Sequence, residues 1–139
     1  MKTIDSFSGD YRFLSNFWPS RVSMDSLTFP TVEHAFQAAK TLDLFQRQMI
    51  RDVPLPGQAK HLGRAVILRQ DWESIKLDVM YGLLKQKFSA KNLKGFLLDT
   101  GDIELIEGNT WGDKFWGTVD GEGQNHLGKL LMQVRSELK

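Results

Sequence analysis

The chain has 139 residues, with 18 Lys or Arg, 17 Asp or Glu and no cysteine. The length fits a single domain over residues 1–139. The lack of cysteine excludes disulfides, thiolate metal sites and a cysteine nucleophile. A formal charge of +1 is too small for binding nucleic acid by charge alone. Chemistry is therefore left to carboxylates, amides, cations and the rings of four Trp, nine Phe and two Tyr residues.

The sequence contains neither a cluster of metal ligands nor a segment apolar enough to enter a membrane. Its three histidines, His34, His61 and His126, are far apart in the sequence, so we expect neither a metal nor another cofactor. The N-terminal residues lack the long apolar run of a signal peptide. No stretch reaches the roughly 18 apolar residues of a membrane span. We therefore expect a cytoplasmic protein that does not contact a membrane.

The first thirty residues are expected to form short strands and turns. Residues 21–24 and 26–29 alternate in polarity around Asp25, which predicts a small hairpin. Residues 13–19 are too aromatic for an ordinary exposed loop, so we expect them to fold back on the core or to line a pocket.

Helices dominate the rest of the prediction. Thr31, Asp71 and Asn125 are expected N-caps, and Pro56 is expected at the first position of a short helix. A strand is expected over residues 103–107 and a loop over 108–124. The expected fold class is α+β, mainly helical with a small antiparallel sheet. The expected helices cover residues 31–40, 43–51, 56–63, 72–88, 89–98 and 125–138.

The first expected helix carries a narrow polar stripe beside a wide apolar face. Glu33, Gln37 and Lys40 form the stripe at positions i, i+4 and i+7. One interpretation is a solvated helix edge. The other is a stripe that runs into the interior or a cleft, where a partly desolvated Glu33 could act as a general acid or base.

The longest expected helix poses two similar choices. Lys76 projects from the middle of an apolar arc, and it either reaches past its neighbours to water or holds a phosphate or carboxylate in a cleft. Trp72 lies at the start of this helix. It either packs in the core or presents a flat surface on which a base stacks.

Residues 107–117 mix acidic and Trp residues with glycines, which suits a pocket wall. Asp113 in this segment is either a turn or capping aspartate, or the second carboxylate of a pair with Glu33. Two carboxylates around one sugar carbon are the usual equipment for cleaving a glycosidic bond. The glycine-rich residues 121–128 lack dinucleotide-loop spacing. They are either a plain loop with an Asn cap or a source of anion-binding amides.

Taken together, these motifs resemble the NADAR family, which includes YbiA-like N-glycosidases. The resemblance covers nearly the whole chain in the family's order. The blocks that carry it are Phe13–Phe17, Pro30–Lys40, Ala59–Arg64, Asp71–Trp72 with Lys76 and Met80, Lys87–Phe88, Asp113–Gly117, and Asn125–Met132 with Arg135.

The resemblance implies a compact α+β domain that cleaves an N-glycosidic bond without a metal. It implies as substrates the phosphoribosylamino-pyrimidine intermediates of riboflavin synthesis, which yield ribose 5-phosphate and a free base. Other relatives are linked to NAD chemistry or to removal of ADP-ribose from guanine. The family's functional Glu, Trp and Asp fall on Glu33, Trp72 and Asp113.

We therefore predict Glu33, Trp72 and Asp113 as catalytic residues, with the roles of the two carboxylates open. Lys40, Lys76 or Arg64 would hold the phosphate or polarise the leaving group, and Trp72 would stack on the base. The full set of predicted substrate-binding residues is Asn16, Phe17, Lys40, Arg64, Lys76, Trp116, Asn125 and Gly128.

Three functions compete at this point, and the oligomeric state stays open. The first is an N-glycosidase with a small phosphoribosyl substrate. The second removes ADP-ribose from a modified base, so nucleic acid enters only as a modified substrate, helped by a basic patch of Lys60, Arg64 and Arg69. The third is a non-catalytic module for nucleotides or ADP-ribose. The near-neutral charge favours a small substrate.

Overall fold

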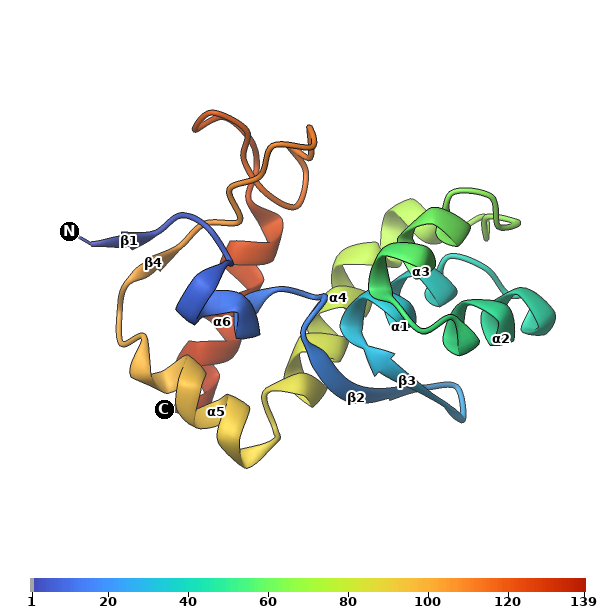
Figure 1. Cartoon of the computed structure of the whole chain (residues 1–139), viewed down its shortest axis with the longest axis horizontal. Helices are drawn as coiled ribbons and strands as arrows, with labels where there is room; N and C mark the ends of the chain where they lie inside the picture. Colours follow the sequence, from blue (N-terminus) through green and yellow to red (C-terminus); the bar gives the residue numbers. More distant parts are fainter. Residues whose placement is uncertain (1) are drawn as a thin grey trace. The chain divides into compact units, whose positions relative to one another are not determined.

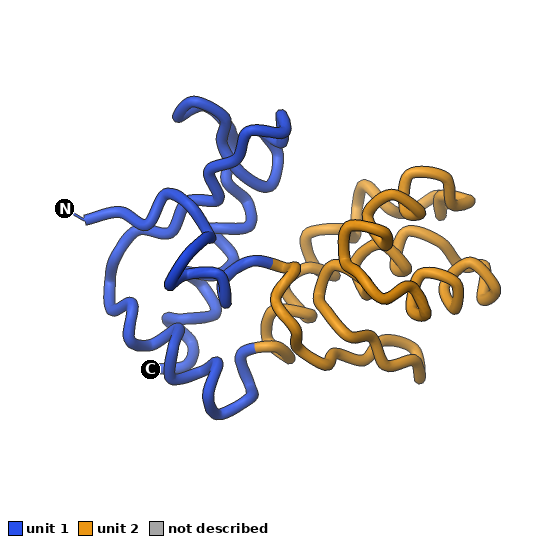
Figure 2. The backbone as a smooth tube through the Cα atoms, viewed as in Figure 1, with its two compact units in different colours: residues 1–15, 88–139 blue, residues 16–87 orange. Residues whose placement is uncertain are grey.

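The computed structural model describes residues 2–139, and its backbone contacts divide the chain into two compact units (Figure 2). Unit 2 is continuous and comprises Asn16–Lys87. Unit 1 comprises the chain up to Ser15 together with Phe88–Lys139. Each unit is described separately, and the expectation of one domain stays a prediction. None of the described helices is long and apolar enough to cross a membrane.

Unit 2 begins with the expected hairpin. Strands β2 (Pro19–Met24) and β3 (Leu27–Thr31) pair antiparallel. Their two turn residues, Asp25 and Ser26, both have positive φ angles, 50° and 69°. Two consecutive left-handed residues give the type of turn whose twist matches that of the strands. The predicted hairpin is confirmed.

Four helices complete unit 2, and their predicted positions are confirmed to within one or two residues. The Thr31 hydroxyl accepts the His34 N–H, and the Asp43 carboxylate accepts the Gln46 N–H, so both helices have side-chain N-caps. Pro56 opens the short third helix, where a missing N–H costs nothing. The helices are α1 (Val32–Ala39), α2 (Leu44–Asp52), α3 (Pro56–Gly63) and α4 (Trp72–Lys87).

Helix α1 is the central element of unit 2. It packs against α2, α3, α4 and both strands of the hairpin (Figure 1), and all eight of its residues are buried. Ala35, Ala38 and Ala39 are completely inaccessible, and their small side chains let neighbouring elements come close. A polar side chain on α1 therefore points into protein on whichever side it lies.

Unit 1 contains a 3₁₀ helix, two α-helices and a second small sheet. Strands β1 (Thr3–Ile4) and β4 (Glu104–Leu105) of this sheet run parallel, so the small antiparallel sheet that we expected is only one of two sheets. A parallel pair has no hairpin turn to mark it in the sequence. The helices of unit 1 are η1 (Gly9–Leu14), α5 (Lys91–Asp99) and α6 (His126–Leu138).

Asn125 is the N-cap residue of α6 as predicted, but it caps the helix without its side chain. Its backbone is left-handed, and its side chain makes no capping hydrogen bond. The side chain instead accepts the Glu107 N–H at 2.9 Å and donates to the Leu105 carbonyl at 3.0 Å. A Cβ added to Gly128 would overlap the same carbonyl oxygen. Asn125 and Gly128 therefore attach α6 closely to β4.

Lys87 ends α4 and is fully buried. Burial lowers the pKa of its ammonium from 10.5 to about 7, because the interior disfavours the charged form. The unfolded chain therefore binds more protons than the folded chain between about pH 7 and pH 10.5. The free energy of unfolding rises with pH across that window, and this gain is lost as the pH falls back to 7.

We expect Lys87→Met to remove this pH dependence. The free energy of unfolding of the original chain, relative to that of the variant, should rise by about 1.4 kcal/mol per pH unit between roughly pH 8 and pH 10. Urea unfolding at several pH values measures the difference. Lys94→Met, at an exposed position of α5, is the control and should give a constant difference. A constant difference for Lys87→Met would contradict the burial argument.

Candidate active site

The polar stripe of α1 lies in the interior of unit 2, as the second interpretation of the sequence predicts. The exposed fractions of Glu33 and Gln37 are 8% and 5%. One helical turn separates them, and Gln37 Nε2 donates a hydrogen bond to Glu33 Oε2 at 2.5 Å. The Glu33 backbone N–H donates to the Asn16 carbonyl at 3.1 Å. Asn16 thus lies at the start of α1, beside the backbone of the buried acid.

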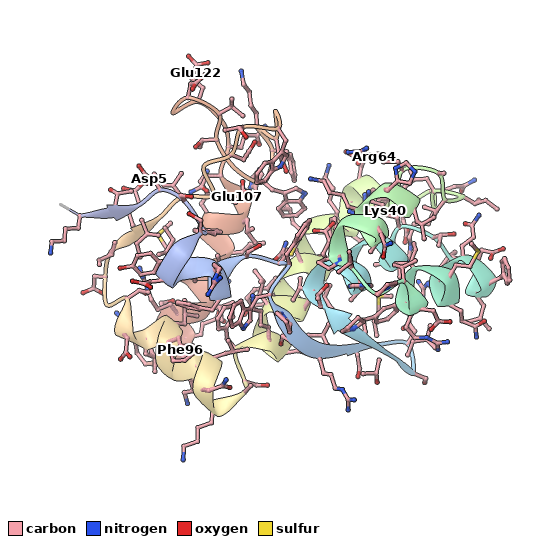
Figure 3. The ribbon with its side chains drawn as sticks, in the orientation of Figure 1. Asp5, Lys40, Arg64, Phe96, Glu107 and Glu122 are labelled. Atoms are coloured by element: carbon pink, nitrogen blue, oxygen red, sulfur yellow. The ribbon has the colours of Figure 1, made fainter. Side chains whose placement is uncertain are left out.

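Lys40 follows α1 and is surrounded by charges. Burial lowers the pKa of Lys40, the negative charge of Glu33 opposes this, and the positive charges of Arg64, Lys60 and Lys76 lower it further. Lys60 lies on α3, Arg64 directly follows α3, and Lys76 lies on α4. Figure 3 shows Lys40 and Arg64 near each other in unit 2. Glu33 and three further cations therefore all act on the Lys40 ammonium.

The beginning of α4 is fastened to the end of α1. The Arg69 backbone N–H donates to the Lys40 carbonyl at 2.8 Å, and the Trp72 N–H donates to the Arg69 carbonyl at 3.3 Å. Both carboxylate oxygens of Asp71 accept from the Arg69 guanidinium, at 2.6 and 3.1 Å. Asp71 precedes α4 as predicted, and its backbone carbonyl accepts the Ser74 N–H. These hydrogen bonds fix the position of Trp72, the first residue of α4, relative to the end of α1.

Trp72 is mostly a core residue. Its exposed fraction is 5%, and its ring packs on Phe36 of α1 with centroids 5.0 Å apart and planes tilted by 57°. On the next turn of α4, Lys76 Nζ lies 2.8 Å from the exposed Glu73 carboxylate. The stacking of a base on Trp72 stays a prediction.

Asn16 and Phe17 precede the hairpin of unit 2. Asn16 Nδ2 donates to the Met80 sulfur of α4 at 3.6 Å, so its side chain contacts the same helix that carries Trp72. The exposed fraction of Phe17 is 41%. Part of the aromatic segment 13–19 therefore reaches the surface, while Phe13 and Leu14 are buried as expected.

Asp113 and Trp116 belong to unit 1. Asp113 Oδ1 accepts the backbone N–H groups of Phe115 and Trp116 at 3.1 and 2.9 Å. The Asn109 side chain accepts the Asp113 N–H and donates to the Asp113 carbonyl. Asp113 is thus the turn aspartate of one interpretation. Its role as a second catalytic carboxylate stays a prediction, as do the substrate roles of Trp116, Asn125 and Gly128.

Gln37 is a site residue to which the sequence assigns no role. Its spacing of four residues from Glu33 is the available signal, because side chains at i and i+4 are neighbours on a helix. Phe36 is likewise expected only on the apolar face of its helix, although it supports Trp72.

Comparison with known proteins shows which class of protein this chain resembles. The NADAR domain model matches residues 5–139. N-glycosidase YbiA of Escherichia coli (strain K12) is 44% identical over an alignment of 139 positions, which covers 96% of this chain and 85% of that protein. Its NMR structure superposes with a TM-score of 0.84 at 42% identity, covering 99% of this chain and 86% of the other. Riboflavin biosynthesis protein PYRR of Zea mays is 40% identical over an alignment of 156 positions, which covers 99% of this chain and 24% of that longer protein.

The shared α+β fold and these relatives place the chain among the hydrolases that act on N-glycosyl bonds. The chain belongs to the NADAR family, which confirms the resemblance seen in the sequence. The expected fold class is confirmed as well.

We expect Lys40→Met to stabilise the protein at neutral pH. In the folded state, burial and the neighbouring cations disfavour the Lys40 charge more than Glu33 favours it, and methionine keeps the length of the side chain without that charge. The melting temperature should rise by about 2–4 °C. Because the pKa of Lys40 is lowered in the folded state, this gain should shrink as the pH rises toward 10.5.

Thermal unfolding followed by circular dichroism measures this effect, with the exposed Lys94→Met as control. A lower melting temperature for Lys40→Met at pH 7 would show that the Lys40 ammonium contributes net stability instead.

Proposed function

We propose that the protein hydrolyses the C1–N glycosidic bond of phosphoribosylamino-pyrimidine intermediates of riboflavin biosynthesis. The products are ribose 5-phosphate and the free aminopyrimidine. The name of the maize relative supports the substrate class, and the E. coli relative supports the reaction. The structural observation that carries the proposal is the buried Glu33 carboxylate, which shares its surroundings with four cations.

The reaction needs help with two changes of charge. As the C1–N bond breaks, positive charge develops on the sugar, and the leaving nitrogen gains electron density. Water supplies a hydroxyl to C1 and a proton to the nitrogen. A carboxylate stabilises the sugar cation or activates the water, and a second acid assists proton transfer. In this proposal the buried Glu33 takes one of these two tasks, and the predicted catalytic role of Asp113 is tested separately.

The cations fit the phosphate end of such a substrate. Lys40 and Lys76 are only partly exposed, so they attract an anion without full screening by water. Arg64 is exposed and adds a planar donor that matches phosphate oxygens. The half-exposed Phe17 is an aromatic surface proposed for the flat base, and the predicted stacking on the buried Trp72 would need the ring to become accessible to the substrate.

The first test replaces each carboxylate by its amide. Glu33→Gln and Asp113→Asn should each lower kcat by about 10²–10⁴-fold, because the amide keeps the size but carries no charge and transfers no proton. The amide oxygen that Asp113→Asn introduces can still accept the Phe115 and Trp116 N–H groups, so the turn survives. Mass spectrometry of the free base, released from riboflavin intermediates, NAD and ADP-ribosyl-guanosine, measures activity and substrate choice.

Glu104→Gln, which replaces an exposed carboxylate on β4, is the matched control and should keep full activity. The proposal is wrong if both Glu33→Gln and Asp113→Asn remain fully active. It is also wrong if the original chain releases no base from the phosphoribosyl substrates.

A second test addresses the phosphate. Arg64→Met should raise KM for the phosphorylated riboside about tenfold, as expected for the loss of a charge-assisted hydrogen bond. KM for the same riboside without its phosphate should stay nearly unchanged. Arg21→Met, at an exposed position of β2, is the control. Equal effects of Arg64→Met on both substrates would remove Arg64 from phosphate binding.

A further inference from the structure

The side-chain amide of Gln37 is held in one orientation by what surrounds it. A carboxylate only accepts hydrogen bonds, so Gln37 must turn its Nε2 toward Glu33. Its Oε1 then points away and is buried without a hydrogen-bond partner. Few buried polar atoms in native proteins lack a partner, and each one calls for an explanation. Here the unpartnered oxygen is the consequence of directing the nitrogen to Glu33.

Gly63, the last residue of α3, lies against this amide. A Cβ added to Gly63 would overlap Gln37 Oε1 and come within 2.7 Å of Cδ and 3.0 Å of Cβ. Any other residue at position 63 would therefore push the Gln37 amide aside. Gly57 of the same helix has nothing within 4 Å of an added Cβ. The close approach of α3 thus requires glycine at 63 but not at 57.

We propose that Gln37 is a positioning residue for the Glu33 carboxylate and that Gly63 provides the space this position requires. The inference rests on the proposed function, in which Glu33 acts on the substrate. A carboxylate that must meet a developing charge works best when its orientation is fixed beforehand. An amide suits this task, because it holds one oxygen of Glu33 without bringing a counter-charge that would cancel the charge of the acid.

The experiment measures base release by Gln37→Ala, Gly63→Ala and the double variant. Each single variant should lower kcat about tenfold or more, with KM changed less than about threefold, because orientation rather than binding is lost. The Gly63→Ala protein should fold, since the two nearest atoms, Oε1 and Cδ, belong to the flexible end of the Gln37 side chain, and the contact with Gln37 Cβ at 3.0 Å needs only a small shift. Gly57→Ala, the matched control in the same helix, should keep the original kcat.

The double variant shows whether Gly63 acts through Gln37. With alanine at position 37 there is no amide to displace, so Gly63→Ala should cause no further loss in that background. Multiplied effects would mean that Gly63 acts independently, which would overturn its part of the proposal. Gln37→Met fills the same space without the hydrogen bond, so it reports on the bond even where Gln37→Ala lowers the melting temperature.

The outcome for Glu33 separates this inference from the proposed function. Loss of activity in Glu33→Gln with normal kcat in Gln37→Met would overturn the role of Gln37 and leave the proposed function standing. Full activity in Glu33→Gln would overturn the inference, and full activity in both Glu33→Gln and Asp113→Asn would overturn the proposed function as well. In the Glu33→Gln background, Gln37→Met should change kcat by less than about twofold, because the carboxylate to be oriented is gone.

Discussion

An ionisable side chain on a fully buried helix must replace the hydration that it loses, and Glu33 on α1 is such a side chain. The Gln37 amide supplies a hydrogen bond, and the Lys40 ammonium supplies opposite charge nearby. Gln37 lies on α1 and Lys40 directly follows it, so both stay near Glu33 when α2, α3 and α4 pack against the helix. The sequence of this one segment therefore helps to make a buried acid tolerable inside unit 2.

The positive charges exceed what Glu33 alone requires. Lys60, Arg64 and Lys76 all disfavour the charged form of Lys40, so their proximity weakens the fold rather than strengthening it. Such an excess of positive charge around Lys40 is relieved when an anion binds among the cations. An arrangement that is unfavourable in the empty protein and favourable with a ligand is characteristic of a functional site.

Local features of the sequence were predictable because their causes are local. The 3.6-residue period of the apolar side chains predicted α1 and its polar stripe. Thr31, a residue type that often caps helices, predicted where this helix begins. The hairpin followed from alternation on both sides of a two-residue turn. The candidate site was predictable to the same extent: Glu33 and Lys40 were proposed together because both fall on the helix expected over residues 31–40.

Features that depend on contacts between distant segments were not predictable in this way. The pairing of β1 with β4 joins two-residue strands from opposite ends of the chain. Asn is a residue type that often caps helices with its side chain, but the Asn125 side chain forms hydrogen bonds with Glu107 and with Leu105 of β4 instead. The importance of Gln37 appears only once α3 brings Gly63 against its amide, because spacing within α1 says nothing about a neighbouring helix.

The formal charge of +1 and the cluster of cations around Lys40 both favour a small anionic ligand over a polymer. A polymer is held by cations spread along a surface, each meeting one phosphate, and that requires a net positive balance. Here the positive charges converge on a partly buried lysine one helical turn beyond Gln37, while the chain as a whole stays close to neutral. Convergence at one point suits a compact anion whose sugar and base extend away from the phosphate. This charge distribution therefore agrees with the small-molecule substrate that the N-glycosidase relatives imply.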